Sequence, residues 1–157
     1  MFIAHAPAGY LLANLHNPTA SKTFLLCAVI ASILPDADLL YFYLIDHRQT
    51  HHHHYWFHVP FFWCVTFSFI YVACRTHWQH LLPYVTISFL CIMLHMALDS
   101  IVAPILWMAP FDDTAFQLHH IIPKYHWWVW NFVLHWSFGI EILICVTAFI
   151  YFRKKYY

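Results

Sequence analysis

Charge is the scarcest property of this 157-residue sequence, because only 9% of its residues are Asp, Glu, Lys or Arg. Ordinary soluble domains carry about a quarter. Seven basic and seven acidic residues give a formal net charge of zero, which leaves no basic surface for nucleic acid and excludes that class of partner. Glycine is also scarce, with two residues, so a linker-rich or fibrous chain is excluded. The abundant residues are hydrophobic (62%) and aromatic (21%), and this balance predicts a membrane protein.

Paired cysteines are missing as well. The five cysteines show no C-x-x-C spacing, and four lie in apolar runs, so we expect small buried side chains rather than disulfides or a cysteine zinc site. The N-terminal residues lack a basic region and include His5 and Pro7, which argues against a cleaved signal peptide. The length suits one domain, so we expect residues 1–157 to form a single integral membrane domain.

Apolar runs recur along the chain, and crossing the hydrocarbon core of a bilayer takes about 20 such residues. No period-2 alternation indicates a transmembrane barrel. We therefore expect an all-α fold, a polytopic membrane helical bundle with about four transmembrane helices. Their predicted positions are 24–34 continued by 39–45, 55–74, 81–98 and 127–152. Residues 2–15 suit an N-terminal half-span, and residues 101–110, which contain two prolines, suit a re-entrant or interfacial segment.

Charge placement predicts the orientation of these helices. If they run antiparallel, basic residues gather at one end, which the positive-inside rule makes cytoplasmic. These residues are Lys22, Arg75, Arg153, Lys154 and Lys155, against Arg48 and Lys124 at the other end. The other end collects Asp36, Asp38, Asp46, Asp99, Asp112 and Asp113 with most of the histidines. We expect a bacterial inner membrane protein whose functional site faces the periplasm and whose C-terminus is cytoplasmic.

Ionisable residues at the outer end indicate a metal site. His95 and Asp99 are four residues apart, so they share one face of a helix. An ionisable residue at membrane depth costs about 2.5 to 3.5 kcal/mol on insertion scales. The pair therefore either forms a hydrogen bond that ties helices together or holds a shared cation. Asp36 and Asp38 follow Pro35, which ends a predicted span, and their carboxylates can converge there; the alternative is a turn or capping role.

A run of histidines supports the same interpretation. His47, His51, His54 and His58 step by four, three and four, so on a helix they would form one stripe, with His52 and His53 pointing elsewhere. Imidazoles this close cannot all be protonated without repulsion, whereas a divalent cation binds them neutral. The alternative is a polar loop beside the lipid headgroups.

Mixed imidazole and carboxylate ligands suit zinc first, with manganese or iron as alternatives, and the number of ligands leaves room for one to three ions. Such a metal lowers the pKa of a bound water to about 7, and paired metals clamp a phosphoester. No nucleophile elbow, P-loop or dinucleotide-binding fingerprint is present, so metal chemistry is the expected chemistry. Asp36 or Asp38 could orient the water. Arg48 could bind a substrate phosphate or could pair with Asp46.

Three motifs in order resemble the LexA-regulated family of membrane-bound, metal-dependent hydrolases. They read Leu34-Pro35-Asp36-Ala37-Asp38, His47-Arg48-Gln49-Thr50-His51, and His95-Met96-Ala97-Leu98-Asp99 followed by an apolar stretch to residue 111. The resemblance spans about residues 3–111. It implies the metal ligands His5, Asp36, Asp38, His47, His51, His95 and Asp99. The sequence departs from the family pattern at Gln49, where glycine is usual, and at His52, where serine is common. The order of motifs is more distantly similar to the zinc-dependent phospholipases C and their nuclease relatives.

The roles of two polar residues in the last predicted span are left open by the sequence. His135 would lie about 12 Å inside the outer end of a helix that starts near residue 127, as a ligand or as a partner of one. Glu141 lies deeper, where a protonated or hydrogen-bonded packing role is at least as well supported as a catalytic role.

The expected function is hydrolysis by metal-activated water of a phosphoester on a lipid or lipid-linked substrate at the outer membrane surface. The alternative is a metal-binding or metal-transporting membrane protein without hydrolase activity. A third alternative is a structural membrane subunit in which the ligands tie helices together.

Overall fold

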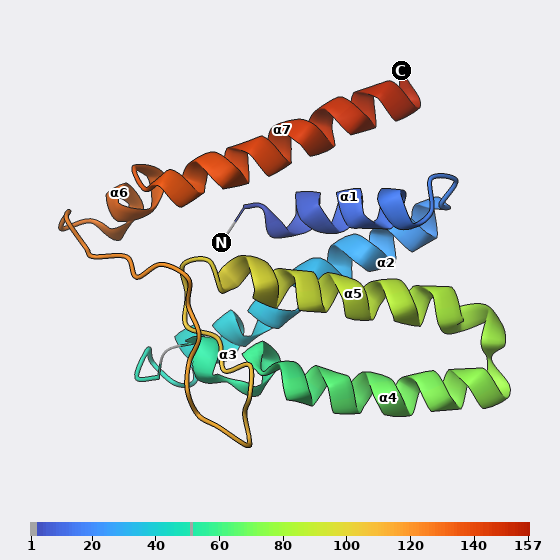
Figure 1. Ribbon diagram of the computed structural model, residues 1–157, viewed down its shortest axis with the longest axis horizontal. Helices are drawn as coiled ribbons and strands as arrows, with labels where there is room; N and C mark the ends of the chain where they lie inside the picture. Colours follow the sequence, from blue (N-terminus) through green and yellow to red (C-terminus); the bar gives the residue numbers. More distant parts are fainter. Residues whose placement is uncertain (1–2, 51) are drawn as a thin grey trace.

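The computed structural model describes residues 3–50 and 52–157, and over these residues it is all-helical, with no strand beyond one isolated bridge between Ile105 and Phe116. The α-helices are α1 (His5–His16), α2 (Lys22–Ile33), α3 (Asp38–Leu44), α4 (Pro60–His77), α5 (Leu82–Asp99), α6 (Trp128–Val133) and α7 (Trp136–Tyr156) (Figure 1). Short 3₁₀ helices connect them: η1 (Pro35–Ala37), η2 (His52–His54), η3 (Trp56–His58) and η4 (Gln79–Leu81).

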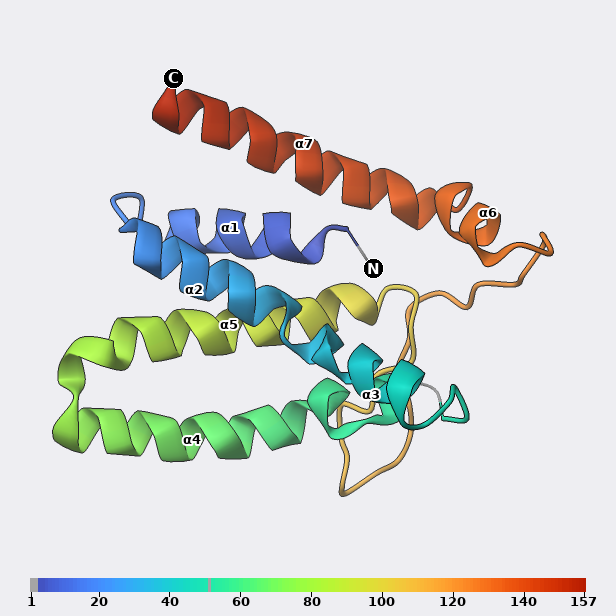
Figure 2. The ribbon, with the colours of Figure 1, turned by 180° about the vertical axis from the view of Figure 1, so that it is seen from behind.

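Two helical hairpins and one added helix build the bundle. α1 and α2 form the first hairpin, α4 and α5 form the second, and α2 packs across α5 to join them. α7 lies along α1 (Figures 1 and 2). The core between the hairpins is apolar. Its buried members include Phe24, Leu25, Ala28, Ile87, Cys91, Ile92 and Met96.

The first hairpin is tight because α1 carries a glycine where it meets α2. A Cβ atom at Gly9 would lie 2.6 Å from the Cβ and the Oγ of Ser32. Glycine therefore permits a backbone approach that no other residue allows without displacing α2.

The two ends of the bundle differ in character. The start of α2, the end of α4 and the end of α7 lie together at one end (Figure 1). The basic residues predicted to be cytoplasmic lie on these segments: Lys22, Arg75, Arg153, Lys154 and Lys155. The opposite end holds α3, α6 and the non-helical segment 100–127 (Figures 1 and 2).

The structure supports fewer membrane spans than the predicted four. By length and composition, residues 79–99 and α7 can each cross a membrane, and α2 continued by residues 35–44 is a third candidate with a 54° bend. The predicted span 55–74 does not qualify. Its helix, α4, has 18 residues, but it runs from Pro60 to a polar last turn with Arg75 and His77, so its mean hydropathy is too low. α1 has twelve residues and a length of about 18 Å, the size of a half-span.

Two local expectations were wrong. The predicted helix 127–152 is broken after α6, and His135 adopts extended backbone (φ −84°, ψ 143°) as the cap of α7. His135 therefore lies at the start of the span rather than 12 Å inside it. Residues 47–58 do not form one helix, because His47 (φ 49°) and Arg48 (φ 66°) are left-handed and the chain continues through η2 and η3. The predicted histidine stripe is therefore broken at His47, and its member His51 lies outside the described residues.

Residues 101–110, predicted to be re-entrant or interfacial, have no helix. The chain that follows folds back on the end of α5, where the backbone N–H of Leu118 donates to the carbonyl of Ser100 (2.7 Å). Trp107 donates from its indole nitrogen to the Ser100 hydroxyl (2.7 Å), and Ile105 is fully buried. These contacts cover the end of α5 where Asp99 lies.

Candidate metal centre

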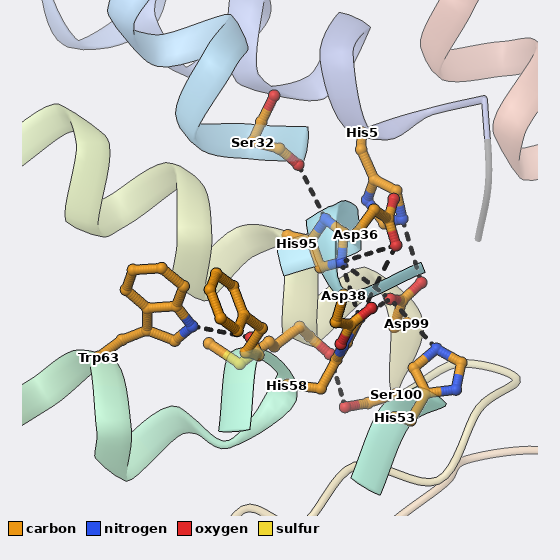
Figure 3. Close-up of polar contacts among 12 residues, drawn as sticks. His5, Ser32, Asp36, Asp38, His53, His58, Trp63, His95, Asp99 and Ser100 are labelled. Atoms are coloured by element: carbon orange, nitrogen blue, oxygen red, sulfur yellow. Dashed lines mark hydrogen bonds and ion pairs between the residues drawn. The ribbon is translucent and has the colours of Figure 1, made fainter. Parts of the chain in front are cut away.

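Four side chains converge at the end of the bundle opposite the basic residues. Asp36 comes from η1, His58 from η3, and His95 and Asp99 from the last turns of α5 (Figure 3). One ligand atom of each lies within 4.8 Å of those of the other three. His58, His95 and Asp99 are buried, whereas the Asp36 side chain is 23% exposed. We call these four residues the donor group.

The separations within the donor group match those of a bound cation's ligands. His95 Nε2 lies 3.1 Å from Asp99 Oδ2, 3.3 Å from His58 Nε2 and 3.7 Å from Asp36 Oδ1. His58 Nε2 lies 3.8 Å from Asp36 Oδ1 and 3.7 Å from Asp99 Oδ2. Tetrahedral zinc with bonds of about 2.0–2.2 Å places its ligand atoms about 3.3–3.6 Å apart. The donor group is therefore of the right size for such an ion.

Hydrogen bonds behind the imidazoles orient both rings. His95 Nδ1 lies 2.8 Å from the carbonyl oxygen of Ser32, which can only accept, so this nitrogen carries the proton. His58 Nδ1 lies 2.6 Å from Asp38 Oδ2 and donates to that carboxylate. Carbonyl and carboxylate partners of this kind are typical behind metal-binding histidines (Figure 3).

These bonds leave the inward-facing nitrogens in a conflict that a cation resolves. With Nδ1 protonated, the Nε2 atoms of neutral His58 and His95 are both acceptors, yet they face each other at 3.3 Å. Both also face the carboxylates of Asp36 and Asp99. Acceptors that face each other repel, and burial strengthens the repulsion. A positive charge removes this cost, whether it is a proton on one imidazole or a metal ion at the centre, so the residues fit a divalent metal.

Two more histidines support Asp99. His5, the first residue of α1, places Nε2 3.1 Å from Asp99 Oδ1, and its ring stacks on that of His95 with centroids 3.8 Å apart. His53 in η2 places Nε2 3.6 Å from Asp99 Oδ2. Burial lowers the pKa of His53, while Asp99 acts in the opposite direction. The lowered pKa favours the neutral ring, which is the form that binds metals.

The sequence-predicted site residues separate into three sets. Asp36, His95 and Asp99 belong to the donor group. Asp38 lies behind it, 4% exposed, with its Oδ2 bonded to His58. His5 contacts the Asp99 oxygen that faces away from His95.

The third set lies elsewhere. His47 and Arg48 are exposed in the turn after α3, and the Arg48 guanidinium lies over the Tyr43 ring at 4.8 Å. The same turn is closed by Asp46, whose Oδ2 accepts from the Thr50 backbone N–H (2.7 Å), a bond that lowers the pKa of Asp46. Among the residues that the structure describes, the donor group does not include His47. His51 lies outside the described residues.

The sequence placed His58 in the predicted histidine stripe, but His58 was not among the predicted metal ligands, and His53 was expected to point away from the stripe. A signal for His58 was present: Pro60, two residues later, is a preferred first residue of a helix, so His58 precedes a helix at the outer end. The indole of Trp63 donates to the carbonyl of Phe57 (2.8 Å) and fixes η3 on the first turn of α4. No comparable signal marks His53, because its position depends on the left-handed turn at residues 47 and 48.

His135 and Glu141, whose roles the sequence left open, are not part of the donor group. His135 accepts from the Ser137 backbone N–H (3.3 Å) as the cap of α7, and its ring lies 5.3 Å from that of His119. Partial burial lowers the pKa of His135, with further lowering by His119. Glu141 is fully buried against the N-terminus of α1.

Comparison with known proteins adds a family. A family model described as YdjM inner membrane protein matches residues 2–157. Comparisons with curated proteins and with solved structures find no match. The matching description names a membrane and no reaction, and it is consistent with the LexA-regulated membrane family that the motifs resemble. Since the match covers nearly the whole chain, the protein belongs to the YdjM inner membrane protein family.

Proposed function

We propose that this protein is a membrane-bound, metal-dependent hydrolase that cleaves a phosphoester of a lipid or lipid-linked substrate at the outer membrane surface. The observation that carries the proposal is the donor group: four ligand atoms from three separate segments, with both imidazoles oriented from behind. Two imidazoles and two carboxylates suit zinc, with manganese or iron as alternatives. When bound, such a metal would make hydroxide available at neutral pH and would polarise a phosphoryl oxygen.

The residues in and around the donor group would orient the ligands, admit the substrate and accept a proton. Asp38 and the Ser32 carbonyl hold the two imidazoles in the tautomer that leaves Nε2 free. His5 occupies Asp99 Oδ1, which leaves Oδ2 directed at His95. Asp36 is the most exposed member, so a substrate would approach from its side. Asp36 is also the residue best placed to accept a proton from an attacking water.

A neighbouring cavity supports a substrate with an apolar part. A pocket of about 450 Å³ lies beside Asp38 and is lined mainly by aromatic side chains. The lining consists of Ala37, Asp38, Tyr41, Tyr55, Trp56 and Phe57. The donor group also lies at the end of the bundle that charge placement assigns to the outer leaflet. A phospholipid or a polyprenyl-linked phosphate would place its phosphate near Asp36 and its apolar part among the aromatic rings.

The experiment combines metal content with turnover. Purified protein in detergent is analysed for bound zinc, manganese and iron, and is assayed against a phospholipid and a polyprenyl phosphoester. We expect His58→Ala and Asp99→Asn to lose both the metal and hydrolysis. His47→Ala is the matched control, because His47 is an exposed histidine of the same segment, and it should retain both. Stoichiometric metal in His58→Ala, or its loss in His47→Ala, would contradict the assignment of ligands.

Metal transport is the competing function, and the packing argues against it. Below the donor group the described core between α2 and α5 is apolar, with Ala28, Ile87, Cys91 and Ile92 buried. A permeating ion needs polar side chains along its path. Uptake of zinc into proteoliposomes, together with metal binding but no phosphoester turnover, would replace hydrolysis by transport.

A further inference from the structure

A buried carboxylate of α7 reaches the N-terminus of α1. Glu141 is fully buried, and its Oε2 accepts from the backbone N–H of Ile3 (2.7 Å) and of Ala4 (3.3 Å). The residues are 138 and 137 positions apart in the sequence, so this contact depends on the packing of α7 along α1 (Figures 1 and 2).

The contact anchors the residues directly before α1. Ile3 precedes the N-cap residue Ala4, whose own side chain makes no capping hydrogen bond. The N–H groups at a helix N-terminus have no partner within the helix and carry partial positive charge, so a carboxylate beside them is stabilising. By accepting from Ile3 and Ala4, Glu141 holds the start of α1 from another helix.

His5 follows immediately after Ile3 and Ala4 and is the first residue of α1. Its Nε2 lies 3.1 Å from Asp99 Oδ1, and Asp99 Oδ2 lies 3.1 Å from His95 Nε2. The first turn of α1 thus sets where the His5 ring stands, and His5 sets which Asp99 oxygen faces the donor group. From this chain of contacts we propose that Glu141 is a positioning residue of the metal centre, acting through the N-terminus of α1 and His5. This inference rests on the metal centre of the proposed function.

α7 holds α1 at its other end as well, which provides a control. Lys155 Nζ donates to Asn14 Oδ1 (2.5 Å) and to the carbonyl of Pro18 (3.0 Å). This contact also joins α7 to α1, but it lies near the end of α1, away from His5. Loosening it should weaken helix packing without moving His5.

The first measurement needs no metal. In metal-free protein with ¹⁵N-labelled histidine, the ring signals of His5 are identified by their loss in His5→Ala. Glu141→Ala should shift these signals, Glu141→Gln should shift them less because its amide oxygen still accepts, and Lys155→Met should leave them unchanged. Unchanged His5 signals in folded Glu141→Ala would overturn the proposal. If the alanine variant does not fold, Glu141→Gln decides on the same criterion.

The second measurement is a double-mutant cycle on zinc affinity. Groups behind metal ligands typically change metal affinity about 10–100-fold. We expect His5→Ala and Glu141→Ala each to weaken zinc binding about tenfold, and the double variant to bind no more weakly than His5→Ala alone, because both act through one ring. Additive losses would show that Glu141 acts independently of His5 and would overturn the inference. If the wild-type protein binds no zinc while His5 signals still respond to Glu141, the metal centre fails and the positioning stands.

Discussion

At the scale of single residues, the polar side chains of the candidate centre make contacts through both of their polar atoms. His58 turns Nδ1 to Asp38 and Nε2 to the donor group, and His95 does the same with the Ser32 carbonyl. Asp99 divides its two oxygens between His5 and His95. Buried polar groups are costly unless they are bonded, so the hydrogen bonds of the two Nδ1 atoms lower the cost of a buried centre of this kind.

Asp38→Asn tests the outer partner of His58. An asparagine keeps the size of the side chain but removes the negative charge that holds the Nδ1 proton, so we expect metal affinity to fall about 10–100-fold without loss of the fold. The measurement is competition of the purified variant with a chromophoric zinc chelator. Asp46→Asn serves as control, because Asp46 closes the turn at Thr50, away from the donor group. Equal affinities in the wild type and Asp38→Asn would show that Asp38 does not orient a ligand.

At the scale of helices, the centre is assembled from helix ends. The first residue of α1, the 3₁₀ turns η1 and η3 and the last residue of α5 all meet at one end of the bundle (Figure 3). Their alignment depends on how closely α1 and α2 pack, since α1 carries His5 and α2 carries the Ser32 carbonyl that holds His95. Gly9 permits this packing.

The two glycines of the chain form a matched pair for testing that contact. Gly9→Ala puts a methyl group 2.6 Å from Ser32 atoms, and overpacking of this kind costs about 1–3 kcal/mol. Gly139→Ala meets nothing within 4 Å and replaces glycine in α7, so it should be neutral or stabilising by up to about 1 kcal/mol. Thermal unfolding in detergent, read by circular dichroism, checks both. A Gly9→Ala variant as stable as Gly139→Ala would show that α1 and α2 can separate freely.

At the scale of the whole molecule, the two ends of the bundle carry different polar residues. Basic residues lie on the segments where α2 begins and where α4 and α7 end, while the donor group lies at the opposite end. By the positive-inside rule, we expect the end with the basic residues to lie on the cytoplasmic side of the inner membrane.

Reporter fusions test the orientation that follows. We expect green fluorescent protein at the C-terminus to fluoresce and alkaline phosphatase inserted after Asp113 to be active, because the first reporter works in the cytoplasm and the second in the periplasm. Asp113 is suited to the insertion since it lies in the exposed part of the non-helical segment 100–127. Active phosphatase at the C-terminus, with an inactive one after Asp113, would reverse the orientation and place the donor group inside the cell.

The sequence by itself determined the class of the molecule and its polarity. Composition and apolar run length are local properties, and they were sufficient to predict an all-helical membrane protein with basic residues gathered at one end. Asp36, His95 and Asp99 were also reachable, because a proline that ends a helix and a four-residue spacing place side chains without knowledge of the fold.

Tertiary structure decided the rest. The choice of His58 over His47 follows from left-handed backbone at residues 47 and 48, which breaks the periodicity that a helical stripe needs. The count of candidate spans depended on which residues each helix contains, and α4 runs from Pro60 to a last turn with Arg75 and His77 instead of covering residues 55–74. The contact of Glu141 with Ile3 joins residues 138 apart, and only the packing of α7 on α1 brings them together. Contacts between distant segments arise from the packing of whole helices, which no local pattern of residues records.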